Sequence, residues 1–157
     1  MKTATLKFSR KPYWYLKDAL EQQDIGYASV SSGSGFDVSI VNPFPSDACP
    51  SIVYEINTSP HSSDFSLNIT FTVSSTYNGI YSTKSYTMSN LKGNYAHRFL
   101  EVDLENQRVF SRSENGEIYK FCDCTIPTNL GPGESILHFT KKTDITNITL
   151  APKWRCL

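Results

Sequence analysis

One nine-residue stretch, FSLNITFTV at residues 65–73, alternates without a break between apolar and polar side chains. Successive side chains of a β-strand point to opposite faces of the sheet, so this pattern predicts a strand with one buried and one solvated face. Such strands are typical of antiparallel sheets, because the strands of parallel sheets are usually covered on both faces. The apolar set is Phe65, Leu67, Ile69, Phe71 and Val73, and the polar set is Ser66, Asn68, Thr70 and Thr72.

Further segments predict short strands joined by turns. In FLEVDL, at residues 99–104, the apolar side chains alternate with Glu101 and Asp103, which we expect to lie on a solvated face. Asn115-Gly116 separates two such runs and predicts a hairpin with a type I′ turn. Residues 135–140 and 145–154 predict two closing strands. About ten short strands without a β-helix-β rhythm predict an all-β sandwich or barrel.

One segment predicts a helix. In KPYWYLKDALEQQD, at residues 11–24, Pro12 suits the first turn of a helix, where its missing N–H is not needed. Tyr13, Leu16 and Leu20 then recur at the spacing of one helical face. We therefore expect an arm with a short amphipathic α-helix at residues 1–35 and a β-sandwich domain at residues 36–157.

The charge balance narrows the classes of partner. With 15 basic and 15 acidic residues the chain has no formal net charge, so we expect neither nucleic acid nor an anionic membrane as a partner. No apolar run approaches the roughly 18 residues of a membrane-spanning helix, and the N-terminus lacks the apolar core of a secretory signal. We therefore expect the chain to fold in a cytoplasm.

No motif points to an enzyme. Cys122 and Cys124 would lie on the same face of a strand, and they lack the spacing of common zinc and redox motifs. We interpret these two and Cys49 and Cys156 as thiols rather than ligands, since a cytoplasm is reducing. The three histidines form no metal-binding or catalytic pattern. We expect no catalytic residues, no metal and no cofactor.

The aromatic side chains leave a second possibility open. Exposed rings with polar groups can stack on sugars at a binding surface. The candidates for such a platform are Tyr13, Trp14, Tyr15, Tyr77, Tyr81, Tyr86, Tyr95 and Trp154.

The C-terminal third of the chain carries a resemblance to a known family. FLEVDLENQRVF, NGEIYKF, IPTNLGPGES-ILHFT and ITNITLAPKWR follow one another between residues 99 and 155. Together they resemble the C-terminal, galectin-like domain of siphophage distal tail proteins. The loop Leu130-Gly131-Pro132-Gly133-Glu134-Ser135-Ile136 matches a loop of that family, with Ser135 in place of the usual Asn. Residues 40–56 are similar to the family's entry strand, with Asn42 and Pro50 in place but no Gly after Asn42.

The resemblance covers about residues 36–157 and implies a function. It implies a galectin-like antiparallel sandwich and a structural or adaptor role in a bacteriophage tail, tail tip or baseplate. Its partners would be further copies in a ring and other tail proteins of the tube, hub or baseplate. The protein would belong to the virion tail and be assembled in the host bacterial cytoplasm.

Two features of the chain refine this expectation. About 35 residues precede the sandwich, where distal tail proteins carry a larger N-terminal domain, so the length fits a shortened tail component or a decoration module. We expect the assembly interface to include Tyr13, Trp14, Leu16 and Leu20. The alternative is a carbohydrate-binding module that aids adsorption to the host surface.

Overall fold

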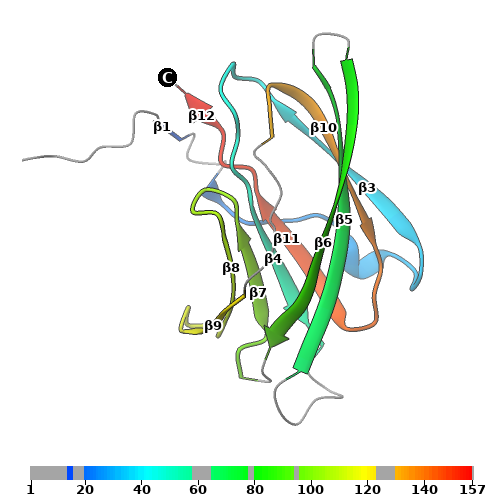
Figure 1. Cartoon of the computed structure of the whole chain (residues 1–157), viewed down its shortest axis with the longest axis vertical. Coiled ribbons are helices and arrows are strands. Elements are labelled where there is room, and N and C mark those ends of the chain that lie inside the picture. Colours follow the sequence, from blue (N-terminus) through cyan, green and yellow to red (C-terminus); the bar gives the residue numbers. More distant parts are fainter. Residues whose placement is uncertain are drawn as a thin grey trace, which may run out of the picture.

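The computed structural model describes residues 14–15, 20–57, 65–77, 80–93, 96–122 and 130–156. It shows two antiparallel sheets that face each other, one of which contains the two longest strands (Figure 1). The elements are β1 Trp14–Tyr15, β2 Gln23–Asp24, η2 Tyr27–Ser29, β3 Gly35–Asn42, β4 Ser51–Ile56, β5 Phe65–Tyr77, β6 Ile80–Gly93, β7 Phe99–Asp103, β8 Arg108–Arg112, β9 Ile118–Cys122, β10 Gly133–Thr140, β11 Ile145–Ala151 and β12 Arg155–Cys156.

The strand order confirms an all-β antiparallel sandwich. The first sheet has the order β3-β10-β5-β6, and the second has the order β2-β11-β4-β7-β8-β9. Every pairing between the described strands is antiparallel. Strands that are distant in the sequence become neighbours, as where β10 lies between β3 and β5.

The core lies between the sheets and follows the period-two alternation of the strands. From the second sheet, Ile52, Tyr54, Leu100, Val102 and Ile148 are at most 2% exposed. Leu137 and Phe139 of β10 enter from the first sheet, each 1% exposed. Burial of this apolar surface is the main favourable term in the folding of a sandwich of this size.

The alternating stretch that predicted a strand at residues 65–73 lies within β5. Ile69 is 3% exposed, whereas its neighbours Asn68 and Thr70 are exposed. The expectation of short strands is wrong here, because β5 has 13 residues and pairs with the 14 residues of β6. These two strands form the long twisted ribbon in the right half of Figure 1.

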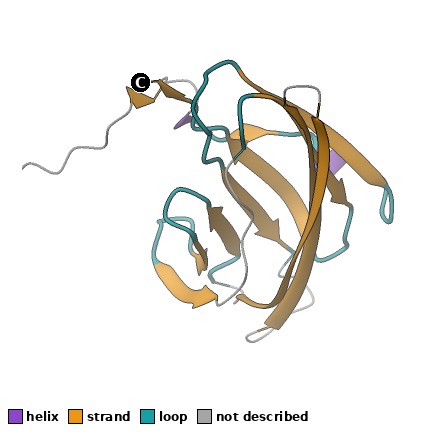
Figure 2. Cartoon of the chain, turned by 45° about the horizontal axis from the view of Figure 1, so that its top comes forward, coloured by secondary structure: helices purple, strands orange, loops and turns teal. Residues whose placement is uncertain are grey.

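The N-terminal helix expected at residues 11–24 is not supported. Trp14–Tyr15 pairs as a strand with Arg155–Cys156, and Gln23–Asp24 pairs with Leu150 and Thr149 of β11. Figure 2 shows helical structure only as short segments among strands. A short helix depends on the packing of its apolar face, and pairing with an existing strand offers this backbone an alternative set of hydrogen bonds.

The segment between the arm and β3 contributes to the core. Tyr27, in η2, is fully buried, and its ring lies 5.5 Å from that of Phe36, which in turn stacks 5.4 Å from Phe139. The hydroxyl of Tyr27 accepts a hydrogen bond from the backbone N–H of Lys142 over 2.8 Å. Part of the segment at residues 1–35 therefore packs with the sandwich.

The hairpin predicted at Asn115-Gly116 is present, but its turn is not type I′. It joins β8 to β9, and Gly116 has a positive φ of 82° while Asn115 does not have one. Type I′ needs positive φ at both central residues. The N–H of Gly116 bonds to Ser113 and the N–H of Ser113 bonds to Glu117, as expected for a three-residue loop that ends in a left-handed glycine.

The expectation that Glu101 and Asp103 lie on a solvated face is wrong for Asp103. This residue is 4% exposed, and its carboxylate accepts a 2.6 Å hydrogen bond from Nδ2 of Asn106. Nε of Arg108 lies 3.4 Å from Oδ2 of Asp103, and Nζ of Lys153 lies 3.6 Å from Oδ1. Burial by itself raises the pKa of Asp103, but the hydrogen bonds from Asn106 and the two cations together lower it below its ordinary value.

Candidate functional site

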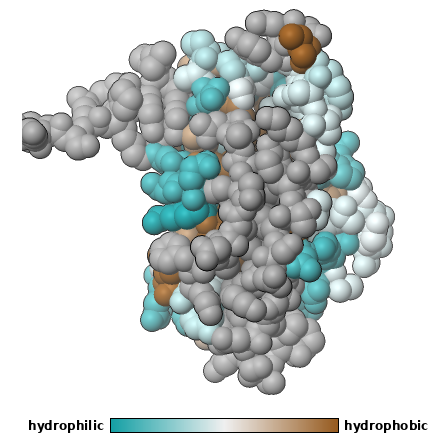
Figure 3. All heavy atoms as spheres, in the orientation of Figure 1, coloured by the Kyte–Doolittle hydropathy of each residue, from teal (hydrophilic) through white to brown (hydrophobic). Residues whose placement is uncertain are grey.

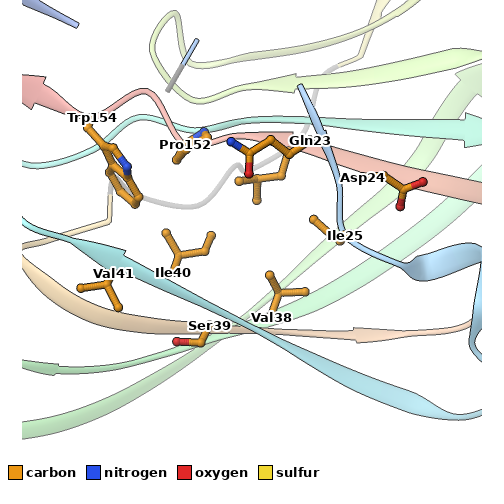
Figure 4. A pocket seen from close by; sticks show the side chains of 10 residues that line it. Gln23, Asp24, Ile25, Val38, Ser39, Ile40, Val41, Pro152 and Trp154 are labelled. Atoms are coloured by element: carbon orange, nitrogen blue, oxygen red, sulfur yellow. The ribbon is translucent and has the colours of Figure 1, made fainter. Parts of the chain in front are cut away.

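A cleft opens where the edges of the two sheets face each other. We call it the edge cleft; its volume is about 350 Å³. Its lining residues are Gln23, Asp24, Ile25, Val38, Ser39, Ile40, Val41, Leu150, Pro152 and Trp154. Asp24 is the one charged side chain among these described residues. In Figure 4, Val38, Ile40 and Trp154 point into the space between the sheets. The cleft thus combines an apolar floor with the backbone of a sheet edge.

Strand β3 forms one side of this cleft because of its alternating sequence, FDVSIV. Ile40 is 6% exposed and Val38 packs against the core, whereas Val41 is 59% exposed. On one side β3 pairs with β10 along its whole length, from Gly35 opposite Thr140 to Asn42 opposite Gly133. None of the other described strands pairs with it. The opposite edge of β3 therefore presents an eight-residue strand beside the cleft.

The face of the first sheet that points away from the core is polar. Nδ1 of His138 lies 2.5 Å from Oδ1 of Asp37, its partner across β3 and β10. Next to them the hydroxyl of Ser39 donates a 2.6 Å hydrogen bond to Oε1 of Glu134. We call this surface the outer polar face.

The same face continues onto the hairpin of β5 and β6. Ser74 and Thr83 share a 3.1 Å hydrogen bond between their hydroxyls. Hydrogen bonds with Ser74 and Thr83, of which the one with Ser74 has the larger effect, lower the pKa of Tyr81. This residue is 67% exposed. Beside it Ile80 is 73% exposed. Among the coloured residues in the view of Figure 3, the hydrophobic ones appear as small separate spots.

The loop that carries the family resemblance has a structural place in the fold. Leu130 is buried and exchanges two backbone hydrogen bonds with Ala48, 2.7 and 2.9 Å long. The side chain of Asn42 donates to the carbonyl oxygen of Gly131 over 3.3 Å. Gly133 begins β10 with a φ of 87°. The loop therefore connects β10 to the end of β3 and to the chain before β4.

The residues predicted for the assembly interface lie near the chain ends or outside the described ranges. Tyr13 and Leu16 are outside the described residues. Trp14 is described by its backbone, which pairs with Cys156, and Leu20 is 47% exposed. Whether these four residues form an interface stays a prediction.

The other candidates are dispersed. Of the aromatic residues, Trp154 lines the edge cleft and Tyr81 lies on the outer polar face. Cys49 is a buried thiol, Cys122 and Cys156 belong to β9 and β12, and Cys124 lies outside the described residues.

The described part of the chain holds neither a group of metal ligands nor a membrane-spanning helix. Among those residues no three His, Cys, Asp or Glu side chains are grouped as metal ligands would be. None of the described helical segments has the length and apolar character needed to span a bilayer.

Sequence reasoning did not single out Val38, Ile40 and Val41 as site residues. Their alternation is typical of a strand, but a strand at a sheet edge has the same local pattern as one with two neighbours. The Asp37–His138 pair was also missed, because its members are 101 positions apart. No local signal could have joined them.

Comparisons of the chain with protein-family models, with curated proteins and with solved structures found no match. The class that the fold defines is an antiparallel β-sandwich, with the edge cleft between its two sheets.

Proposed function

We propose that this protein is a structural component of a bacteriophage tail or tail tip, and that it acts by protein–protein assembly. The observation that carries the assembly role is the edge of β3 beside the apolar edge cleft, with which none of the described strands pairs. An uncovered edge strand is a template for pairing with another chain, and proteins usually keep such edges short, charged or covered. Here the edge is eight residues long, and a partner would cover it.

The assignment to a phage tail rests on the resemblance to distal tail proteins. The two segments that carry it, around Asn42 and around Leu130–Glu134, adjoin each other at the end of β3 and the start of β10. Their contact makes them one structural unit, which supports reading them together. The proposed partners are further copies in a ring and tail proteins of the tube, hub or baseplate. The protein would act in the virion tail, without a catalytic step or a cofactor.

Light scattering coupled to size-exclusion chromatography tests the assembly role. We expect the full chain to form a closed oligomer, alone or on mixing with the products of neighbouring tail genes, because repeated subunit contacts close into rings when the rotation allows. A chain that stays monomeric at all concentrations and retains none of those proteins would contradict the proposal.

A carbohydrate-binding module is the second candidate, and Tyr81 is the observation in its favour. Tyr81 is exposed, and its hydroxyl hydrogen-bonds with Ser74 and Thr83, so its ring would stack on a sugar while these hydroxyls bind the sugar's oxygens. A glycan array tests this candidate. Binding that Tyr81→Ala abolishes and Ile80→Ala leaves intact would support it, since both side chains are exposed at the same hairpin end. Absence of any glycan binding would rule it out.

A further inference from the structure

The free edge of β3 and the N-terminal residues of the chain have complementary properties. We propose that residues 3–8 of a neighbouring copy add as a strand to the edge of β3 and lie over the edge cleft. This inference rests on the proposed assembly function, and it names the contact through which copies join.

The occupant has the sequence of a strand. Residues 3–8 read TATLKF, in which Ala4, Leu6 and Phe8 alternate with Thr3, Thr5 and Lys7. In an extended chain the three apolar side chains would point to one side. A strand that pairs with β3 would turn this side toward the cleft and the polar side toward solvent.

The receiving surface matches that pattern. Val38 and Ile40 are two residues apart on β3 and point toward the cleft (Figure 4), just as Leu6 and Phe8 are two residues apart in the occupant. Leu150 of β11 and Trp154, which lies between β11 and β12, contribute to the apolar lining on the opposite side. Backbone hydrogen bonds with the unpaired edge would supply affinity, and the apolar contacts would set the register.

Charge favours the same pairing. Residues 1–13 contain four basic residues, Lys2, Lys7, Arg10 and Lys11, and no acidic one. The described surface around the β3 edge carries carboxylates at Asp24, Asp37 and Glu134. Complementary charge raises the rate of encounter and disfavours wrong partners.

The segment leaves the described part of the chain close to an edge cleft. Trp14 pairs with Cys156, two residues beyond the cleft-lining Trp154, so residues 1–13 precede a point near the rim of a cleft. Five residues, 9–13, separate the proposed strand from Trp14 and can span up to roughly 17 Å when extended. Lys11 precedes Pro12, which disfavours a helical turn there, and the adjacent charges of Arg10 and Lys11 favour extension.

Removal of residues 2–12 tests the proposal. We expect the shortened chain to keep its unfolding transition and to run as a monomer in light scattering where the full chain is an oligomer. A synthetic peptide of residues 1–13 should then bind the shortened chain and shift the backbone amide NMR signals of residues 35–42. A peptide carrying Leu6→Asp and Phe8→Asp should bind about tenfold more weakly or worse, because two apolar contacts become buried charges.

A matched pair of substitutions locates the contact on the sandwich. Val41 lines the cleft at 59% exposure and Ile80 lies on a hairpin at 73% exposure, so Val41→Lys and Ile80→Lys make the same charge change at two exposed sites. We expect Val41→Lys to weaken peptide binding about tenfold by repelling the basic segment, and Ile80→Lys to leave it unchanged.

Three outcomes would overturn the inference and leave the proposed function standing. In the first, the full chain assembles and removal of residues 2–12 changes nothing. In the second, the peptide binds, but the full chain is a monomer whose amide NMR signals of residues 35–42 match those of the peptide complex. The segment would then occupy the cleft of its own chain, and assembly with other tail proteins would remain open to the same light-scattering test. Failure of the peptide to bind while the chain assembles would likewise sink only the inference.

Discussion

The side chain of Asn42 joins the end of β3 to the loop before β10 by donating a hydrogen bond to the carbonyl oxygen of Gly131. The bond is 3.3 Å long, and the same Nδ2 donates over 2.8 Å to the carbonyl oxygen of Ser46. Its Oδ1 accepts from the N–H of Phe44 over 3.1 Å. At 3% exposure, this one amide bonds to three backbone groups in two loops, the one that contains Phe44 and Ser46 and the one that precedes β10.

Replacement of Asn42 by Ala should therefore destabilise the fold. We expect a loss of about 1–3 kcal/mol in the free energy of unfolding, because buried backbone groups would lose their partners. Urea denaturation followed by fluorescence measures this. Ser39→Ala is the control, since its hydroxyl bonds to Glu134 on an exposed surface and should contribute less than about 0.5 kcal/mol. Equal effects of the two substitutions would contradict the role assigned to Asn42.

Two buried tyrosines should respond differently to the loss of their hydroxyls. The hydroxyl of Tyr27 accepts from Lys142, whereas among the described residues that of Tyr54 has no hydrogen-bond partner. We expect Tyr27→Phe to cost about 1 kcal/mol and Tyr54→Phe to be neutral or stabilising, because an unpartnered buried hydroxyl is a cost to folding. Paired urea denaturation curves decide this. A larger loss for Tyr54→Phe would be inconsistent with its unpartnered hydroxyl.

The stabilisation from Asp103 should depend on pH. Its pKa is lower in the folded chain than the ordinary value of 3.8, so folding favours the ionised carboxylate. That contribution is complete above the unfolded pKa and is lost as the pH falls through the folded pKa. We expect Asp103→Asn to cost about 1–3 kcal/mol at pH 7, and the difference from the unsubstituted chain to shrink below about pH 4.

Thermal unfolding of both chains between pH 2.5 and 7 measures this dependence. Glu114→Gln serves as the control, because Glu114 pairs with Arg98 at 64% side-chain exposure, and exposed pairs contribute about 0–1 kcal/mol. A pH-independent difference for Asp103→Asn would mean that packing, and not charge, explains the effect.

Gly35 should control the position of the His138 ring. A Cβ at Gly35 would lie 2.6 Å from Cε1 and 2.8 Å from Nε2 of that ring, closer than real contacts allow. We expect Gly35→Ala to displace the ring and separate it from Asp37, at a cost below about 1 kcal/mol because the pair is exposed. A double-mutant cycle measures the coupling: the cost should disappear in a chain that already carries His138→Ala. Additive effects would show that the ring is not displaced.

Much of the secondary structure was predictable because its signals are local. The alternation around Ile69 placed a strand in β5, and Asn115-Gly116 placed a hairpin between β8 and β9. The predicted helix is not supported, because Trp14–Tyr15 and Gln23–Asp24 pair with strands far along the chain, and such pairing leaves no signal in the local spacing of apolar residues. The pairing of Gln23–Asp24 with β11 depends on a strand more than 120 positions away, which no local pattern reveals.

The candidate site was largely beyond sequence reasoning. Val38 and Ile40 lie two residues apart, as residues on one face of a strand do, but only the strand order places β3 at an edge of the described sheet. Alternation correctly placed Asp103 and Val102 on opposite faces of the sheet. It could not show that Asn106, Arg108 and Lys153 surround the carboxylate of Asp103.

The sequence by itself determined that this chain forms antiparallel strands with one apolar side each, since side-chain alternation acts within a few residues. Only the tertiary structure decided which strands become neighbours, and with that the unpaired edge of β3, the cleft beside it and the burial of Tyr27. These depend on contacts between segments distant in the chain, where many pairings satisfy the same alternation and only the packing of the whole core selects one.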